Sequence, residues 1–517
     1  MTISISKVAI IGAGAGGLVT LNEFLHTSKS GRSTITKDQE RHELPEEPAF
    51  EEVVVFEQND TIGGVWNYTE TADEGFPETV KEYYSPLGIR PPRSPPTDLE
   101  NTSNAKPVEV KAKKTYQWNT SGVYENLYTN VPIETMRFSS GAHVKSGIGC
   151  NVNPFVMHHH VLDYLKEFAE TNDLKKYIRF RSSIEQMYKE EKTGKWVLTV
   201  VQTVDGVERW YQEKFDAVVV AVGKFNIPFF AEIDGLPNYA IKHKNVKHAK
   251  SYRKSKDYKD KRILIVGAHV SAIDMLQYLV SQCKEIHVSL NSPSIEEFNP
   301  TNDPAKAWIW SVLTDPAFGV HVHPKIHHFA DDHIEFFDGE KDNFDEVILA
   351  TGYHTYYPFL NVPQNEGKEY VKISPVSDKD PHTQQSIVNN LYLYTFAIGD
   401  PTVCHIGLPR TPLFFLLSEV SAIAIAGVWS KAKSLPSQEQ QRQWVKDFET
   451  AKIAGAPVIL GDQSLELYNT IHSLGPKDRY NFFDHHSNVD FLAIKQLQKS
   501  FFYKVIRGEI KLPAAAE

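Results

Sequence analysis

Residues 6–19 read SKVAIIGAGAGGLV, and this stretch predicts the fold around it. The apolar, β-branched run over 6–12 predicts a buried strand, and the spaced leucines that follow predict a helix. Gly12, Gly14 and Gly17 have the GxGxxG spacing. The first permits a tight turn, the second lets the backbone approach a pyrophosphate, and the third lets helix and strand pack closely. We expect a nucleotide-binding turn that includes Gly16, with a purely structural glycine turn as the alternative.

An acidic residue ends the next apolar run, VVVFE at 53–57. The Glu57 carboxylate can accept hydrogen bonds from ribose hydroxyls. It lies farther from the first glycine than the usual offset of about 20 residues, and the polar insertion at 28–50 accounts for the excess. The stretch GGVWNY at 63–68 follows, so Gly64, Val65 and Trp66 are expected beside a second part of the same ligand, although Trp66 could equally pack in the core.

The composition is that of an ordinary globular protein of 517 residues, with 41% hydrophobic and 23% charged side chains. A prior of about 150 residues per domain suggests roughly three units. The net charge of −10 argues against a nucleic-acid surface. Cys150, Cys283 and Cys404 stand far apart, which disfavours a disulfide scaffold, a zinc site and a CxxC redox centre. Three consecutive histidines at 158–160 cannot all face one metal ion, so no metal site is expected.

Two features bear on the location of the protein. The N-terminal residues lack a basic region and a signal cleavage pattern. The most apolar late stretch, 412–430, carries Glu419 near its middle, and an acid at a bilayer centre costs about 2.5–3.5 kcal/mol. We expect a buried helix there, no membrane span and a cytoplasmic protein.

Strands alternate with helices along the chain, which predicts an α/β fold with parallel sheets. A second strand–turn–helix pattern, RILIVGAHVSAID, occupies 262–274, with a hairpin expected around 338–346. The polar segments 28–50 and 88–114 read as insertions, and the residues after 430 read as mainly helical.

Several short segments stand in a specific order along the chain. Besides the first glycine turn and GGVWNY, they are VYENLYTNVPIETMRF at 123–138, VGKFNIPFFAEIDGL at 222–236, KHAKSYRK at 247–254, VGAHVSAID at 266–274, ATGY at 350–353 and FAIGDPT at 396–402. Over most of residues 5–430 the sequence resembles the flavin-containing monooxygenases.

The resemblance implies two Rossmann-like dinucleotide-binding domains, the smaller inserted into the larger. We expect the FAD-binding domain at 1–227 and 340–517, with a helical C-terminal tail, and the NADPH-binding domain at 228–339. The resemblance also implies a reaction in two steps. NADPH reduces the flavin, and O2 then forms a C4a-hydroperoxide, from which one oxygen atom passes to a soft sulfur or nitrogen nucleophile of a small molecule. Such an intermediate survives only where water and proton donors are excluded. A homodimer is left open.

The same resemblance assigns individual residues. Asn130 matches the family's active-site asparagine, and an amide can donate and accept hydrogen bonds without changing charge. Thr129 precedes it in the cofactor site. Asp400 resembles the acid that meets the ribityl chain of the flavin. Tyr252 stands in the segment that links the two domains, where the related Baeyer–Villiger enzymes carry Trp.

The second glycine turn is looser than the first. Gly267 is kept, His269 replaces the second glycine, and Ala272 replaces the third, which the motif tolerates. Ser271 and the helix N-terminus that it opens are candidates for phosphate contact, whereas His269 is either a phosphate ligand or a surface residue. Ser292 follows the next strand, where relatives place Arg-Thr. Arg253, Lys254 and Lys325 could therefore supply the missing cation for the 2′-phosphate.

The sequence offers three alternative functions. Baeyer–Villiger oxygenation of a ketone keeps both cofactors, and Tyr252 in place of Trp argues against it. A flavin-binding protein that merely oxidises NADPH and releases H2O2 is disfavoured by Asn130. A two-dinucleotide disulfide reductase would need a close cysteine pair, which the sequence lacks.

Overall fold

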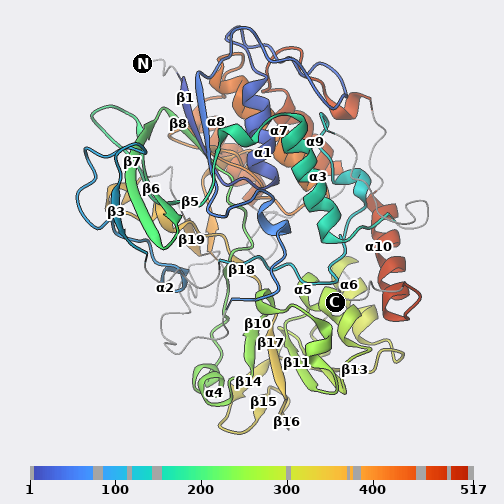
Figure 1. The fold of residues 1–517 in the computed structure, drawn as a ribbon. Helices are drawn as coiled ribbons and strands as arrows, with labels where there is room; N and C mark the ends of the chain where they lie inside the picture. Colours follow the sequence, from blue (N-terminus) through green and yellow to red (C-terminus); the bar gives the residue numbers. More distant parts are fainter. Residues whose placement is uncertain are drawn as a thin grey trace.

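The computed structural model describes residues 5–73, 86–112, 119–141, 154–298, 304–368, 373–375, 386–449, 462–485 and 491–510 (Figure 1). The helices of this part of the chain are α1 (Ala15–Leu25), α2 (Pro86–Ile89), α3 (His158–Thr171), α4 (Leu236–His243), α5 (Val270–Leu279), α6 (Pro304–Leu313), α7 (Phe414–Trp429), α8 (Gln438–Glu449), α9 (Asp462–His472) and α10 (Phe491–Ile506). The strands are β1 (Lys7–Ile11), β2 (Glu52–Phe56), β3 (Val108–Lys111), β4 (Ile178–Arg179), β5 (Ser182–Lys189), β6 (Trp196–Val204), β7 (Val207–Phe215), β8 (Ala217–Val220), β9 (Ile227–Pro228), β10 (Val246–His248), β11 (Arg262–Val266), β12 (Glu285–Ser289), β13 (Val320–His323), β14 (Ile326–Phe329), β15 (Ile334–Phe336), β16 (Lys341–Asp342), β17 (Glu346–Leu349), β18 (Tyr353–His354), β19 (Ile373–Pro375), β20 (Ser386–Val388), β21 (Leu391–Tyr392), β22 (Phe396–Ala397) and β23 (Val403–His405).

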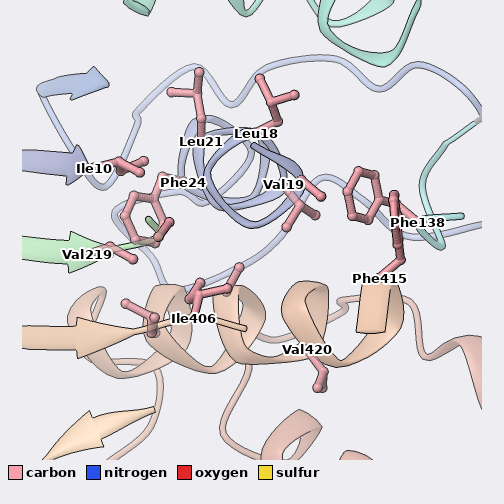
Figure 2. Close-up of a cluster of buried hydrophobic side chains, with 14 of the residues drawn as sticks. Ile10, Leu18, Val19, Leu21, Phe24, Phe138, Val219, Ile406, Phe415 and Val420 are labelled. Carbon is pink, nitrogen blue, oxygen red and sulfur yellow. The ribbon is translucent and has the colours of Figure 1, made fainter. Parts of the chain in front are cut away.

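The larger sheet has the order β21-β22-β23-β8-β1-β2-β4, and its central strands run parallel. Both faces of these strands are buried, as the continuous apolar runs predicted. Helices α1 and α7 cover one face. Figure 2 shows Val19 and Phe24 on the side of α1 that faces α7 and the sheet, whereas Leu18 points away from α7. Helix α7 is almost wholly buried, so the stretch at 412–430 is a core helix, as expected.

An antiparallel sheet of order β3-β7-β6-β5 covers the other face of the larger sheet. Trp196, Tyr211 and Phe215 of β6 and β7 pack against Phe56 and Val220 of the larger sheet. Strand β3 lies within the predicted insertion 88–114 and pairs with β7. That part of the insertion is therefore an edge strand rather than a loop.

The smaller sheet has the order β10-β17-β11-β12-β13 and is wholly parallel. Helix α5 packs on one face, and the small sheet β14-β15-β16 lies near the other with α4. In Figure 1 this unit occupies the lower part of the molecule, below the larger sheet. The predicted α/β fold with two dinucleotide-binding units is confirmed.

Two connections join the sheets, and they pair with each other. Strand β9 leads out of the larger unit and lies antiparallel to β18, which leads back. The expected boundary at 227/228 falls at β9. The expected return at 339/340 comes too early, because β17 pairs with β10 and β11 in the smaller sheet. The chain returns after Leu349.

The C-terminal tail is divided between the two units, which corrects its assignment to the larger domain alone. Arg479 lies in the larger unit, where its guanidinium binds Glu23 of α1 and Glu419 of α7. Helix α10 instead packs on α5 with Phe501 and Phe502. In the part of the chain that the structure describes, no helix combines the length and the apolar character that a membrane crossing needs.

Candidate functional site

The first glycine turn follows β1 directly and opens α1. Gly12 has φ +101°, and its N–H donates to the Phe56 carbonyl oxygen at 2.7 Å. A Cβ on Gly17 would lie 1.9 Å from the Gly12 carbonyl oxygen, so only glycine allows this approach of helix to strand. Gly14 is the N-cap of α1 and has no side-chain cap. Because the first-turn N–H groups of a helix lack internal partners, this end of α1 suits an anion.

The Glu57 carboxylate lies beside this turn. It accepts hydrogen bonds from the Ala13 N–H at 2.8 Å and from the Asn59 N–H at 2.9 Å. Burial raises the pKa of Glu57, and these backbone donors oppose the rise. Oε1 also accepts from Asn59 Nδ2 at 3.0 Å, so it is Oε2 that has a further lone pair for a hydroxyl donor.

A second glycine pair packs against the first turn. Gly63 has φ +114° and donates its N–H to the Ala13 carbonyl oxygen at 3.0 Å. A Cβ on Gly14 would lie 3.6 Å from the Gly64 Cα. Val65 is 43% exposed, whereas Trp66 is half-buried against the main core and also lines the cavity described below. Trp66 therefore belongs to both environments that the sequence left open.

Asn130 follows Thr129 on the wall of the cavity described below. The Thr129 N–H donates to the Val156 carbonyl oxygen at 2.8 Å, and the Val156 N–H donates to Thr129 Oγ1 at 3.2 Å. Thr129 is buried, and Asn130 is exposed toward the cavity. The buried threonine thus fixes the backbone from which the asparagine side chain projects.

The second glycine turn repeats the geometry of the first in the smaller sheet. Gly267 has φ +103°, and its N–H donates to the Ser289 carbonyl oxygen at 2.9 Å. His269 is the N-cap of α5. Both His269 and Ser271 are exposed on the cavity wall, and Ser292 lies buried beyond β12.

The three cations weighed for a 2′-phosphate have different surroundings. The Arg253 guanidinium donates to the carbonyl oxygens of Thr69 and Ser121, both at 2.8 Å, and it does not line the cavity. Lys254 pairs with Glu70 and does not line the cavity either. Lys325 lines the cavity, and its N–H donates to the Ser292 carbonyl oxygen at 2.7 Å. Only Lys325 of these three stands beside Ser292.

One cavity of about 2510 Å³ joins the two glycine turns. The predicted site residues that line it are Gly12, Gly14, Gly16, Glu57, Gly64, Val65, Trp66, Thr129, Asn130, Gly267, Ser271 and Ser292. The cavity is large enough for more than one dinucleotide-sized ligand, since ordinary ligand pockets measure about 300–1,000 Å³.

Four predicted cofactor residues do not line the cavity. Gly17 and Ala272 pack their helices onto the sheets. Tyr252 is 1% exposed, with its ring edge-on to Tyr124 at 4.9 Å, so it is a core residue rather than a ligand contact. Asp400 is buried in an ion pair with Lys189 and accepts a hydrogen bond from Thr402. The direct contacts predicted for Tyr252 and Asp400 are corrected accordingly.

Sequence reasoning missed several residues of the cavity wall. Lys224 is buried, and its Nζ donates to the carbonyl oxygens of Leu408 and Pro409 at 2.8 and 2.6 Å. Burial, and then the nearby Arg410, lower the pKa of Lys224 well below its usual value. Asp274 of α5 and Lys499 of α10 also line the cavity. Lys224 directly follows Gly223, where the apolar run 215–223 ends, and this position could have identified it as a site residue. Nothing in the local sequence marks Lys499.

The sequence and the fold were compared with known proteins. Residues 110–295 match the family model described as flavin-binding monooxygenase-like. The flavin-containing monooxygenase FMO GS-OX1 of Arabidopsis thaliana is 27% identical, with 98% of this chain and 91% of that protein covered.

Solved structures show a similar fold over nearly the whole chain. The S-allyl-L-cysteine S-oxygenase of Allium sativum has a TM-score of 0.62 at 24% identity and covers 99% of this chain and 95% of its own. Tmm from Pelagibacter has a TM-score of 0.64 at 18% identity and covers 97% and 91%.

Proposed function

We propose that this chain is a flavin-containing monooxygenase that binds FAD and NADPH and oxygenates a small molecule at sulfur or nitrogen, which its similarity to that family supports. The observation that carries the proposal is the single cavity that connects both glycine turns with Asn130. A hydride donor and a flavin must meet in one enclosed space, and this cavity offers that space.

FAD is assigned to the larger unit. The uncapped N-terminus of α1, with Gly12 and Gly14, would receive the pyrophosphate. The remaining lone pair of Glu57 Oε2 would accept from a ribose hydroxyl. The absence of side chains at Gly14 and Gly64 leaves room for close passage of the ligand, and Thr129, Val65 and Trp66 would flank it.

NADPH is assigned to the smaller unit. Gly267 and the N-terminus of α5 at Ser271 would receive its pyrophosphate. Lys325 beside Ser292 would contact the 2′-phosphate as a point charge, without the bidentate geometry of arginine. We expect weaker discrimination against NADH than an arginine at this position would give.

When bound, the flavin supplies electron transfer from NADPH and activation of O2. The contribution of the chain is to orient the ligands and to exclude water. The Asn130 amide can hold a ligand oxygen or nitrogen in place without delivering a proton, because it does not titrate. Apolar groups such as Phe229 and Ile406 form part of the surrounding wall.

The test is a comparison of the wild-type protein with Asn130→Ala after supplementation with FAD. The wild type should retain a flavin absorbance, oxidise NADPH, and convert a panel of thioethers and tertiary amines with little H2O2. The alanine variant should still bind FAD but release H2O2 as its main product. A colourless protein in excess FAD would refute the proposal. Conversion of ketones to esters, or H2O2 alone from the wild type, would favour the alternative functions.

A further inference from the structure

A hydrogen bond crosses the cavity wall between the two units. Tyr124 lies in the segment that ends at Asn130, and its phenolic O–H donates to the Asp274 carboxylate of α5. Helix α5 opens at the second glycine turn, one turn before Asp274. This bond therefore ties the asparagine segment to the helix assigned to NADPH.

The Tyr124 side chain is held firmly. It is 6% exposed, with ring contacts to Tyr252 at 4.9 Å and Tyr278 at 5.6 Å. After Tyr124 the backbone continues in ordered contacts, and the Glu125 N–H donates to the Arg253 carbonyl oxygen at 3.0 Å. The position of the Tyr124 hydroxyl is thus set by packing, and the Asp274 bond transmits that position to α5.

Asp274 and Asn130 face the same small space. Both line the large cavity, and both also line an adjoining cavity of about 20 Å³ together with Gln498 of α10. A shift of α5 relative to Tyr124 would change the distance between a ligand at the start of α5 and the Asn130 amide.

The charge on Asp274 is poorly compensated. Its carboxylate accepts from Gln277 Nε2 at 2.9 Å and from the Tyr124 hydroxyl, and both of these donors are neutral groups. Burial raises the pKa of Asp274 to about 7. Asp274 is half-buried at the cavity wall. A carboxylate partly withdrawn from water costs free energy, so its hydrogen bond to Tyr124 is worth most when the acid is ionised.

Titratable groups surround Asp274 on each packed element. Tyr278 lies on α5 itself, Tyr124 and Tyr128 on the asparagine segment, and Lys499 on α10 faces the large cavity. Tyrosines stay neutral near pH 7. His269, the N-cap of α5, lines the large cavity as well. Asp274 is therefore the member of the Asp274–Tyr124 pair that changes charge near neutral pH.

We propose that Asp274 and Tyr124 are positioning residues that hold Asn130 in register with the dinucleotide bound at the start of α5. The inference rests on the proposed function. When the bond is lost, NADPH, a proton and O2 give NADP⁺ and H2O2, and less oxygen reaches the substrate. The two residues contact each other and the cavity, and they act on the reaction through Asn130.

The first test measures the fraction of oxidised NADPH that appears as H2O2 between about pH 6 and 8.5, a range that brackets the titration. In the wild type this fraction should rise as the pH falls through about 7, because protonation removes the charge-assisted bond. Asp274→Asn keeps an acceptor but cannot ionise, so its fraction should be high and independent of pH. Tyr124→Phe should raise the fraction about tenfold, the value of one charge-assisted hydrogen bond.

Tyr258→Phe is the matched control. Tyr258 is equally buried in the same core and stacks near Tyr252, but it makes no contact with Asp274. Its variant should keep the coupling and the pH profile of the wild type. A wild-type profile in Asp274→Asn, or wild-type coupling in Tyr124→Phe, would overturn the proposal.

The second test does not depend on turnover. Calorimetric titration of the FAD-loaded protein with NADP⁺, in two buffers of different ionisation enthalpy, counts the protons taken up on binding. A dinucleotide that covers Asp274 and adds phosphate charge should cause more proton uptake near neutral pH in the wild type than in Asp274→Asn, since the phosphate itself and other groups exchange protons equally in both proteins. Equal uptake in both proteins would refute the role of Asp274 alone, whereas absence of NADP⁺ binding by the wild type would overturn the proposed function as well.

Discussion

Replacement of Arg479 by methionine should destabilise the larger unit strongly. The Arg479 guanidinium is fully buried, and it donates to Glu23 Oε2 at 2.9 Å, Glu23 Oε1 at 2.8 Å and Glu419 Oε1 at 3.1 Å. Three charge-assisted bonds at about 1.5 kcal/mol each give about 4–5 kcal/mol. Breaking a buried ion pair from one side costs about 3–5 kcal/mol, so the two routes agree.

The assay is thermal unfolding followed by tryptophan fluorescence. With about 2.1 cal/mol/K of unfolding entropy per residue, a loss of 4 kcal/mol lowers the Tm of a chain of this size by about 4 °C. The matched control is Arg32→Met, because Arg32 pairs with Asp478 at the surface, where its side chain is 61% exposed. That pair contributes little, and its loss should shift the Tm by less than about 1 °C.

The loss of stability caused by Arg479→Met should depend on pH. Burial raises the pKa of Glu419, and Arg479 opposes that rise. Without Arg479 the pKa of Glu419 rises further, so folded Glu419 retains a proton that the unfolded chain releases above its ordinary pKa. The difference in unfolding free energy between the wild type and the variant should therefore grow as the pH rises from about 5 to 8 and shrink toward pH 4. An Arg479→Met protein that melts within about 1 °C of the wild type at pH 7.5 would refute this reasoning.

Three further changes follow from the packing of the site and the tail. Gly17→Ala should lower the retained FAD severely, since its Cβ would lie 1.9 Å from the Gly12 carbonyl oxygen, and the flavin-to-protein absorbance ratio of the purified variant checks this. Lys325→Ala should raise the KM for NADPH about tenfold, roughly the value of one charged contact, and leave that for NADH unchanged, as steady-state assays with both cofactors would reveal. Phe501→Ala removes a ring that contacts Tyr128 at 5.1 Å. It should cost about 3–5 kcal/mol of local stability, detectable as faster proteolysis of the tail, and equal digestion rates would count against that packing role.

The sequence was most informative where local rules dominate. Both glycine turns, the strands before them and the buried helix at 412–430 follow from spacing and apolar runs, because a strand–turn–helix unit is set by neighbouring residues. The same holds for Glu57, which directly follows β2 and lies beside the turn.

The errors arose where tertiary contacts decide. Nothing in the segment 340–352 distinguishes a strand of one sheet from a strand of the other, so β17 was assigned to the wrong unit. Tyr252 and Asp400 were placed by resemblance, yet their burial depends on partners such as Tyr124 and Lys189, far away in the sequence. For the same reason no local pattern predicted that Asp274 would meet Tyr124.

Helix α10 gives the smaller unit an additional covalent attachment. The antiparallel pair of β9 and β18 alone would act as a two-stranded hinge, about which the nucleotide units could swing. The tail is anchored at Arg479 in the larger unit and at Phe501 in the smaller one, so it joins the two units a second time. Rotation of the smaller unit must then strain the tail or displace α10. The relative orientation of the two units is thus restrained by the end of the polypeptide as well as by its middle.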